Sequence, residues 1–352
     1  MPSSEKTGNA AKERLFEKHV PVALRSKKSG FNIAIVADFN IAGQLTKLFR
    51  LINNHTIHRA RCIVFQGDYL SYDRDIVLSD NDSGQWEEAQ EIIAKADFFH
   101  IGRFPVRDNR LALLERLSPN NCVIQYFGTQ LRQNANKIYS WHQNKQITGI
   151  GAWDFTMIQN APFFYHINMM FDSAIVQAVP EPQGTIRVVH PTTDRRIKKT
   201  ELFLDAIKVL ENKYDVKGIV IEGKTNEECL ALKGSAHMTF DQISVGIYGV
   251  SAIESLAMGH VVFGGISNFA ASVYPDNPLV WVTPYNVEQK IEYFLKHPEL
   301  LSTRGKMGRE WVKRYHDPLK ILRQFLYIYD LVRNGHNFMT APDEQLLEKE
   351  ND

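Results

Sequence analysis

The feature that most constrains this chain is a repeated alternation of short apolar runs with amphipathic helical segments, once in each half. In the first half, residues 31–37 form an apolar run rich in Ile and Val, and residues 44–52 then carry apolar side chains at helical spacing. In the second half, the alternation restarts with a strand at 186–189 and a helix at 200–210. Strands that alternate with helices predict a parallel sheet covered on both faces. We therefore expect an α/β chain with two doubly wound, Rossmann-like domains.

Length and composition fit two globular domains. The chain has 352 residues, which is too long for one ordinary core, and it is 44% hydrophobic and 23% charged. A Pro/Gly cluster at 179–184 is typical of an interdomain linker. The predicted organisation is a basic N-terminal extension over 1–30, a first domain over 31–180, a second domain over 185–317, and a C-terminal helix with a polar tail over 318–352. Whether that helix crosses back to the first domain stays open.

Charge and cysteine content argue against several classes of protein. The net charge is +1, so no global field favours nucleic acid or a membrane. Cys62, Cys122 and Cys229 lie far apart and form no CxxC pair, which disfavours a disulfide framework and a zinc site. No signal-peptide run and no run of about 18 apolar residues occur, so we expect a cytoplasmic protein without a transmembrane segment. The basic residues between 12 and 28 fit a solvated extension, with peripheral membrane contact or an anionic acceptor as alternatives.

The segment 241–263 carries the most chemical information. It consists of a glycine loop, a short helix, a glycine stop and an apolar strand. Glycines at 246 and 249 allow a backbone to approach a ligand closely, and a helix N-terminus offers free N–H groups to a phosphate or a hydroxyl. Glu254, in the first turn of the helix, could accept two hydrogen bonds from a ribose diol. Ser251 and Glu254 also fit a capping box, and the residues alone do not decide between these roles.

This segment resembles the C-terminal signature of GT-B glycosyltransferases of the family-4-like group. That signature is a glycine loop, a helix with Glu-Ala-Met-Ala-x-Gly and a strand, and here the helix reads Glu-Ser-Leu-Ala-Met-Gly over 254–259. The resemblance implies that Glu254 holds the nucleotide ribose and that Tyr248, Gly249 and Ser251 belong to the donor loop. It also implies two Rossmann-like domains facing a cleft, with the acceptor domain first and the nucleotide-sugar domain second.

One position departs from the group's pattern. Many members carry another glutamate eight positions before the ribose glutamate, and this chain has Gly246 there. A subgroup with Asp-Gln before Gly-x-Tyr-Gly exists in this fold, and Asp241-Gln242 with the glycines at 246 and 249 resembles it. Asp241 lies too far upstream to replace the missing glutamate. The effect of the missing glutamate on activity is therefore open.

Positive side chains crowd the turn 190–200, between the first strand and the first helix of the second domain. Arginine forks and lysine ammonium groups suit phosphate oxygens, so the turn predicts an anion site, with a solvated basic turn as the alternative. The stretch resembles the family's arginine followed by Lys-Gly-Thr, in which the two cations grip the donor diphosphate. Lys198 matches the lysine, and either Arg195 or Arg196 matches the arginine. Such a clamp would stabilise the leaving diphosphate without a metal.

The first domain offers weaker candidates for a donor or acceptor loop. Asn40 and Gly43 follow the first strand, where GT-B enzymes often carry a glycine-bearing loop, although a plain loop is equally consistent. Gly128, Thr129 and Arg132 resemble the family's His-Gly-Ser/Thr segment followed by Leu-Arg, with a phenylalanine in place of the histidine. A salt-bridged helix residue is the alternative for Arg132.

His100 is the candidate general acid or base. It ends a predicted strand that we expect to face the cleft, and a structural histidine is the alternative. No histidines and carboxylates have metal-ligand spacing and no DxD motif occurs, so neither a metal nor a cofactor is expected beside the nucleotide-sugar.

The leading hypothesis is a metal-independent glycosyltransferase, hexosyl- or pentosyl-, that works with retention of configuration. The alternative is a catalytically idle GT-B protein that binds a nucleotide or glycan as a partner. A sugar epimerase or a phosphorylase of similar fold would need an acid/base pair or a cofactor lysine, and neither signature is clear. The acceptor, whether glycan, lipid-linked sugar, protein or modified nucleic acid, stays open.

Overall fold

The computed structural model describes residues 30–67, 70–79, 81–102, 110–151, 164–179 and 181–335, without the side chains of Thr129 and Phe269. The predicted N-terminal extension, up to residue 29, and the polar tail beyond residue 335 lie outside the described residues. The chain forms two compact units. Unit 1 comprises Met1–Gly67, Asp73–Asn168 and Leu319–Asp352, and unit 2 comprises Asp68–Tyr72 and Met169–Pro318.

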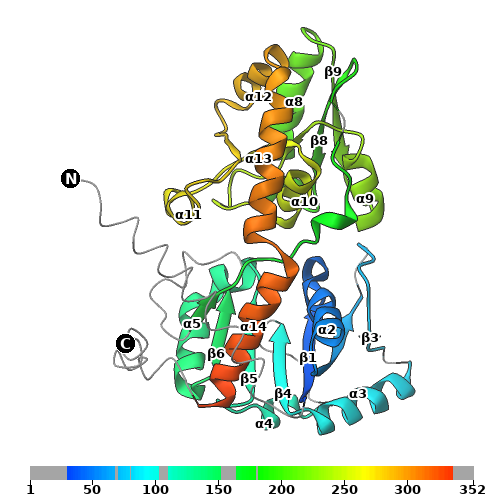
Figure 1. The fold of residues 1–352 in the computed structure, drawn as a ribbon, viewed down its shortest axis with the longest axis vertical. Coiled ribbons are helices and arrows are strands. Elements are labelled where there is room, and N and C mark those ends of the chain that lie inside the picture. The colour runs from blue at the N-terminus through cyan, green and yellow to red at the C-terminus, as the bar shows by residue number, and fades with distance from the viewer. Residues whose placement is uncertain are drawn as a thin grey trace, which may run out of the picture. The chain divides into compact units, whose positions relative to one another are not determined.

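Unit 1 is built on a seven-stranded parallel sheet (Figure 1). Its strands are β1 (Asn32–Phe39), β2 (Arg59–Gln66), β3 (Ile76–Val77), β4 (Phe98–Gly102), β5 (Cys122–Tyr126), β6 (Thr148–Gly151) and β7 (Phe164–His166). They lie in the order β3-β2-β1-β4-β5-β6-β7. Both faces of a covered parallel strand are buried, and residues 33–37 of β1 are accordingly shielded throughout.

Helices connect the strands of unit 1. They are the 3₁₀ turn η1 (Ile41–Gly43), α2 (Gln44–His55), α3 (Ser83–Lys95), α4 (Leu113–Arg116), α5 (Thr129–Lys145) and the C-terminal α14 (Pro318–Arg333). From Leu319 onward α14 belongs to unit 1. Its apolar face packs on the sheet, where the Tyr329 ring lies 4.6 Å from the ring of Phe98 (Figure 1).

Unit 2 contains a five-stranded parallel sheet in the order β12-β11-β10-β8-β9. The strands are β8 (Ile186–Pro191), β9 (Val216–Ile221), β10 (Met238–Phe240), β11 (Val261–Gly264) and β12 (Val280–Trp281). The helices are η2 (Ser173–Ile175), α7 (Arg195–Lys198), α8 (Thr200–Glu211), α9 (Asn226–Lys233), α10 (Val250–Met258), α11 (Asn268–Val273), α12 (Val287–Lys296) and α13 (Glu299–Tyr315).

Side-chain alternation along β8 divides the unit 2 core between the two faces of the sheet. Val188 belongs to the larger cluster, together with Phe203 of α8 and Ile291 of α12. Val189 faces the other way and packs with Leu232 of α9. The doubly wound arrangement that the sequence predicts is therefore present in this unit.

The segment before β8 belongs to unit 2 rather than to the first unit. Phe171 N–H donates to the carbonyl of His316, and Val179 N–H donates to the carbonyl of Met258. These backbone bonds tie residues 169–179 to α13 and α10, so the division between units falls at Asn168, before the Pro/Gly cluster that suggested a linker.

Candidate functional site

The candidate site lies at the carboxyl ends of the unit 2 strands, at the point where the strand order reverses. β8 pairs with β9 on one side and with β10 on the other. Ligands of open α/β sheets bind at such switch points, outside the carboxyl ends of the strands. The loop after β8 leads into α7, and the loop after β10 leads into α10. The two segments that the sequence singles out therefore end at one place in the fold.

Asp241 connects these two loops. Its Oδ1 accepts a hydrogen bond from the ammonium of Lys198, and its Oδ2 accepts one from Gly249 N–H at 3.1 Å. The Asp241 side chain is fully buried, whereas 14% of the Lys198 side chain is exposed. Gly249 is the N-cap residue of α10. A lysine ammonium has three donor protons and Asp241 takes one of them, so Lys198 is able to bind a second anion from its accessible side.

Glu254 is the fifth residue of α10 and so lies beyond the first turn, where the sequence had predicted it, and it forms a buried ion pair. Lys233 Nζ donates to Glu254 Oε2 at 2.6 Å, to the Ser251 carbonyl at 3.0 Å and to Ser251 Oγ at 2.9 Å. Three acceptors match the three protons of the ammonium, which satisfies a lysine that is wholly shielded from solvent. The Asn226 amide donates to the other carboxylate oxygen, Oε1, at 3.1 Å. Each carboxylate oxygen can accept a further hydrogen bond, so a hydroxyl ligand is still compatible with this arrangement.

The capping-box interpretation of Ser251 and Glu254 is wrong. The helix begins two residues earlier than that interpretation requires, because Gly249 occupies the N-cap position and makes no side-chain cap. Glu254 bonds Lys233 and Asn226 instead of a backbone N–H. The other expected cap is confirmed, since Gly259 ends α10 with a φ of 86°.

Gly246 has a conformational reason to be glycine. Its φ is +77°, in the left-handed region that glycine adopts without a steric penalty, and its carbonyl accepts a hydrogen bond from Ser267 N–H. A glutamate at this position would be strained in this loop conformation. The loop therefore needs a glycine at the position where many members of the resembled group carry their first glutamate.

The ring of Tyr248 does not line a ligand surface. It is buried and packs edge-on against Trp311 and Tyr274, with centroid distances of 5.1 and 6.1 Å. The prediction that the Tyr248 side chain belongs to the donor loop is therefore wrong, because the ring is enclosed in the core. The reason is that α13 supplies Trp311, which makes an aromatic core directly under the loop.

Acidic neighbours balance the basic turn. Asp194 caps α7 by accepting from Arg196 N–H at 2.9 Å. Arg195 donates to Glu222 at 2.9 Å and also lies 3.4 Å from the carboxylate of Glu201. The Glu222 carboxylate raises the pKa of Arg195, and Arg195 in turn lowers the pKa of Glu222. The expected excess of positive charge at this turn is thus largely neutralised within unit 2.

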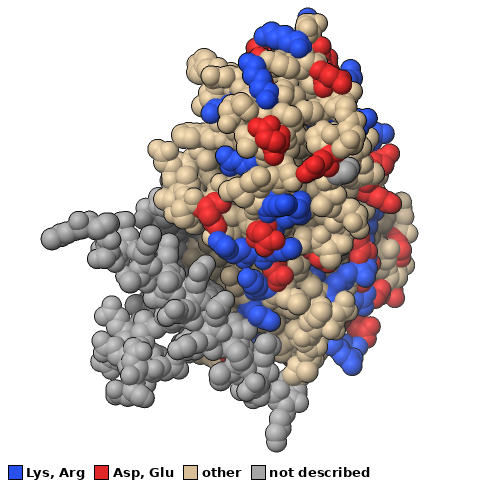
Figure 2. Space-filling model, turned by 45° about the horizontal axis from the view of Figure 1, so that its top comes forward, with Lys and Arg blue, Asp and Glu red and all other residues tan. Residues whose placement is uncertain are grey.

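Arg195 and Arg196 can change partners more readily than Lys198 can. The Arg196 side chain is 92% exposed and pairs with Asp194 at 3.4 Å, and the Arg195–Glu222 pair is also exposed. Exposed ion pairs contribute little to stability, so both arginines can exchange a carboxylate for a phosphate. Lys198 is held by a buried partner. Figure 2 shows the same mixture of charges more widely, with Lys and Arg interspersed among Asp and Glu on the described part of the face that it draws.

In unit 1, Asn40 and Gly43 shape the loop after β1. Asn40 Oδ1 accepts from Leu45 N–H at 3.2 Å, and its amide donates to Thr46 Oγ1 at 2.8 Å. Gly43 has a φ of 68° and precedes α2 as its N-cap. Asn40 is 4% exposed, and its amide stabilises the start of α2.

Gly128 and Arg132 lie together at the start of α5. Gly128 has a φ of +65°, and a Cβ at this position would lie 3.3 Å from the guanidinium of Arg132. The structure therefore brings these two predicted residues together, and it places Thr129 on the backbone of the same turn.

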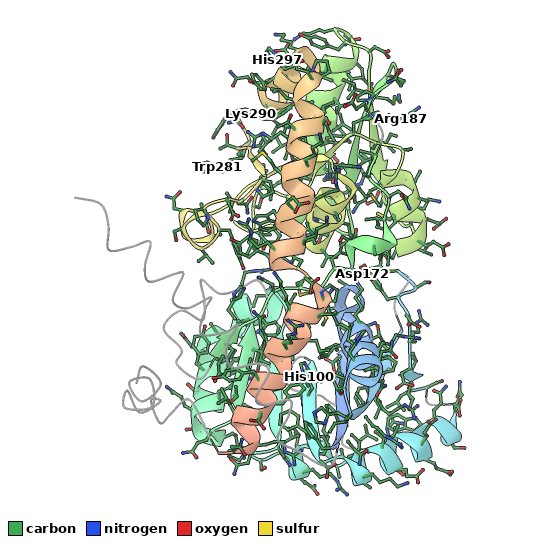
Figure 3. All side chains as sticks on the ribbon, in the orientation of Figure 1. His100, Asp172, Arg187, Trp281, Lys290 and His297 are labelled. Atoms are coloured by element: carbon green, nitrogen blue, oxygen red, sulfur yellow. The ribbon has the colours of Figure 1, made fainter. Side chains whose placement is uncertain are left out.

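The expectation that His100 faces a cleft is wrong. The side chain is fully buried in the middle of the unit 1 sheet, where α14 covers it (Figure 3). Its Nδ1 lies 2.6 Å from the Tyr329 hydroxyl and its Nε2 lies 2.9 Å from Gln125 Oε1. Burial lowers the pKa of His100 to about 4. The residue is a core histidine in the middle of β4, and it contacts Tyr329 of α14, which lies 229 positions away in the chain.

The sequence did not indicate Lys233 or Asn226, or Asp241 as the partner of Lys198. Lys233 is an ordinary lysine near the end of a short helix, and its role depends on α9 packing beside α10. In the part of the chain that the structure describes, no three His, Cys, Asp or Glu side chains gather as a metal site would require. None of the described helices has the length and apolar character needed to cross a membrane.

No protein-family model matches the chain, and no curated protein matches its sequence. Solved structures are similar in fold. A glycosyltransferase from Rickettsia africae ESF-5 is 13% identical, with a TM-score of 0.62 over 87% of this chain and 99% of the other. An α-glucosyltransferase in complex with UDP and a 13-mer DNA containing a central A:G mismatch is 12% identical, with a TM-score of 0.58 over 86% of this chain and 100% of the other.

A sucrose-phosphate synthase from Thermosynechococcus elongatus is 13% identical, with a TM-score of 0.56 over 87% of this chain and 100% of the other. At such identities the similarity establishes the fold. The chain therefore has the GT-B fold, with two Rossmann-like domains.

Proposed function

We propose that the chain is a glycosyltransferase that transfers a sugar from a nucleotide-sugar to an acceptor, without a metal ion and with retention of configuration. Unit 2 would hold the donor and unit 1 the acceptor. The observation that carries the proposal is the position of Glu254. Its carboxylate belongs to α10, the helix that follows the glycine loop after β10, and Lys233 fixes its orientation.

Two sets of groups would bind the nucleotide. The Glu254 carboxylate would accept hydrogen bonds from the ribose diol. Lys198 and the N-terminus of α10 would face the diphosphate, and Arg195 or Arg196 would exchange its acidic partner for a phosphate oxygen. Positive groups at the diphosphate stabilise the charge that develops on the leaving group, which is why no metal ion is required in this proposal.

UDP-sugars are the first donors to test, because the α-glucosyltransferase of similar fold was solved with UDP. The same structure also contains a 13-mer DNA, and the acceptor of this chain has to be found separately. A second candidate function is a catalytically idle nucleotide- or glycan-binding protein. Gly246 favours it, since this residue stands where many relatives of the resembled group carry a glutamate.

The deciding experiment compares wild type with Glu254→Gln against UDP-, GDP-, ADP-, CMP- and dTDP-sugars in the presence of EDTA. Glutamine is preferred to alanine because its amide oxygen can still accept from Lys233. We expect one nucleotide class to raise the Tm of wild type, and its affinity to fall about tenfold in the variant, which corresponds to one lost charged hydrogen bond. Glu310→Gln, an exposed change of equal charge on α13, should bind like wild type.

The same assay separates the two candidate functions. Donor hydrolysis or transfer identifies an enzyme, whereas binding without turnover identifies the idle protein. A 2′-deoxy analogue should bind wild type more weakly than the nucleotide itself does. In Glu254→Gln the two affinities should be equal, because the diol contact is then already missing. If no nucleotide binds, or if Glu254→Gln binds every nucleotide like wild type, the donor site is not where we place it.

A further inference from the structure

Asp241 is the only residue of the described switch-point loops that bonds both the Lys198 ammonium and the N-terminus of α10. It directly follows β10 and its side chain has no exposed surface. One oxygen accepts from Lys198 and the other accepts from Gly249 N–H. An ammonium group and a helix N-terminal N–H are also the kinds of donor that bind phosphate oxygens. The carboxylate thus occupies donors that a phosphate would use.

The surrounding backbone holds this negative charge in place. Asp241 N–H donates to the carbonyl of Phe263, and the next residue, Gln242, donates its side-chain amide to the Ile247 carbonyl at 2.7 Å. Gly265 N–H bonds the carbonyl of Gln242 at 2.8 Å. Asp241 therefore differs from Glu222, whose exposed side chain can turn away from the basic turn when an anion arrives.

The charges of Lys198 and Asp241 together determine how strongly the site attracts an anion. Lys198 and Asp241 cancel each other, so an anion that approaches the accessible side of Lys198 also meets a fixed negative charge behind it. A low local dielectric strengthens this repulsion relative to that between exposed charges. Such a counter-ion lowers the affinity of the site for phosphates, the nucleoside diphosphate product included.

We propose that Asp241 is a built-in counter-ion that weakens diphosphate binding at Lys198 and so promotes release of the product nucleotide. This inference rests on the proposed function only for the identity of the ligand, since repulsion of a diphosphate by Asp241 does not require turnover. The relevant chemistry is that of any diphosphate group, which allows inorganic pyrophosphate to serve as the probe.

The test is isothermal titration of the full chain with pyrophosphate, UDP and uridine in EDTA, comparing wild type with Asp241→Asn. The amide is similar in shape, and its oxygen can still accept from Gly249 N–H. We expect pyrophosphate and UDP to bind about tenfold more tightly to the variant, with a steeper loss of affinity as salt rises, because one more positive charge is uncompensated. Uridine, which has no phosphate, should bind equally to both.

Asp205→Asn is the matched control, since it makes the same charge change on the exposed face of α8, and it should leave pyrophosphate affinity within about twofold of wild type.

Weaker or unchanged pyrophosphate binding in a folded Asp241→Asn protein would overturn the proposal, because Asp241 would then serve to position Lys198. Asp241→Ser provides a second neutral variant that can accept from Gly249 N–H. If neither variant folds, Asp241 is required for the loop itself, and the counter-ion role is likewise rejected. The outcome is separable from the proposed function: tighter pyrophosphate binding without any sugar transfer supports the counter-ion and rejects the enzyme, whereas sugar transfer with unchanged pyrophosphate binding does the reverse.

Discussion

Lys233 Nζ lies 2.6 Å from Oε2 of Glu254 in the interior of unit 2, and each side chain is at most 5% exposed. Removing one member of a buried pair leaves the other charge uncompensated. We expect Lys233→Met to lower the free energy of unfolding by roughly 3–5 kcal/mol, as measured by urea denaturation. In the Lys233→Met/Glu254→Leu double variant much of this loss should be recovered, since neither charge is then left alone. Additive effects of the two single substitutions would contradict the coupling.

Lys198 and Arg196 should differ in their effect on donor use, if the proposed function holds. Lys198 is anchored beside α10, whereas the side chain of Arg196 is 92% exposed and can be replaced by solvent or by its neighbour. We expect Lys198→Met to lower kcat on the order of 100-fold and Arg196→Met to lower it less than about tenfold. The measurement is steady-state turnover of the donor identified by the nucleotide panel. Equal losses would indicate that the whole turn acts as a diffuse basic patch.

His100 should make the stability of the chain depend on pH between about 4 and 6.5. In the unfolded chain the ring takes up a proton near pH 6.5, whereas burial in the folded chain lowers its pKa to about 4. The unfolded state therefore binds more protons in this window, and the folded state loses stability as the pH falls through it. The Tyr329 hydroxyl and the Gln125 carbonyl oxygen are the polar groups that face the ring.

The comparison is between wild type and His100→Gln, with the free energy of unfolding measured at several pH values from 4 to 7. The variant lacks this titration, so its stability should fall less steeply, by about 1.4 kcal/mol per pH unit. Its lower stability at pH 7, from the changed hydrogen bonds, is a separate effect. Parallel pH profiles would show that His100 is not shielded as described.

Gly305 permits α13 to approach α10 closely. A Cβ at this position would lie 2.3 Å from the Gly259 carbonyl oxygen, and a backbone atom cannot move aside as the end of a long side chain can. The clash should outweigh the helix preference of alanine, so Gly305→Ala should lower the free energy of unfolding by about 1–3 kcal/mol. Gly234→Ala is the control, because its nearest contact would be 3.4 Å and its φ is −57°. It should stay within about 1 kcal/mol of wild type by urea denaturation.

The repeated alternation of strands and helices was sufficient to predict two doubly wound units, because the periods of apolar residues are local properties of the chain. Gly259 was recognisable as a helix stop for the same reason, since a positive φ after the last turn is a local requirement. Gly246 was noticed as a departure from a pattern, and its φ of +77° now supplies a conformational reason.

Residues that act through distant partners could not be assigned in this way. The sequence suggested a catalytic His100, and the tertiary structure encloses it with α14, which comes from the other end of the chain. It left open whether Glu254 forms a capping box or binds a ribose, and the structure pairs the carboxylate with Lys233 on a different helix. It marked Lys198 as a phosphate ligand without indicating that the buried Asp241 neutralises it.

The sequence by itself determined that strands and helices alternate in each half of the chain, and that the glycine loop and the basic turn belong to the second domain. The tertiary structure decided which charges oppose each other there, because ion pairing and burial depend on distances between residues that the chain brings together only when it folds. Lys198 with Asp241 and Lys233 with Glu254 are separated by 43 and 21 positions, and no local pattern encodes either pair.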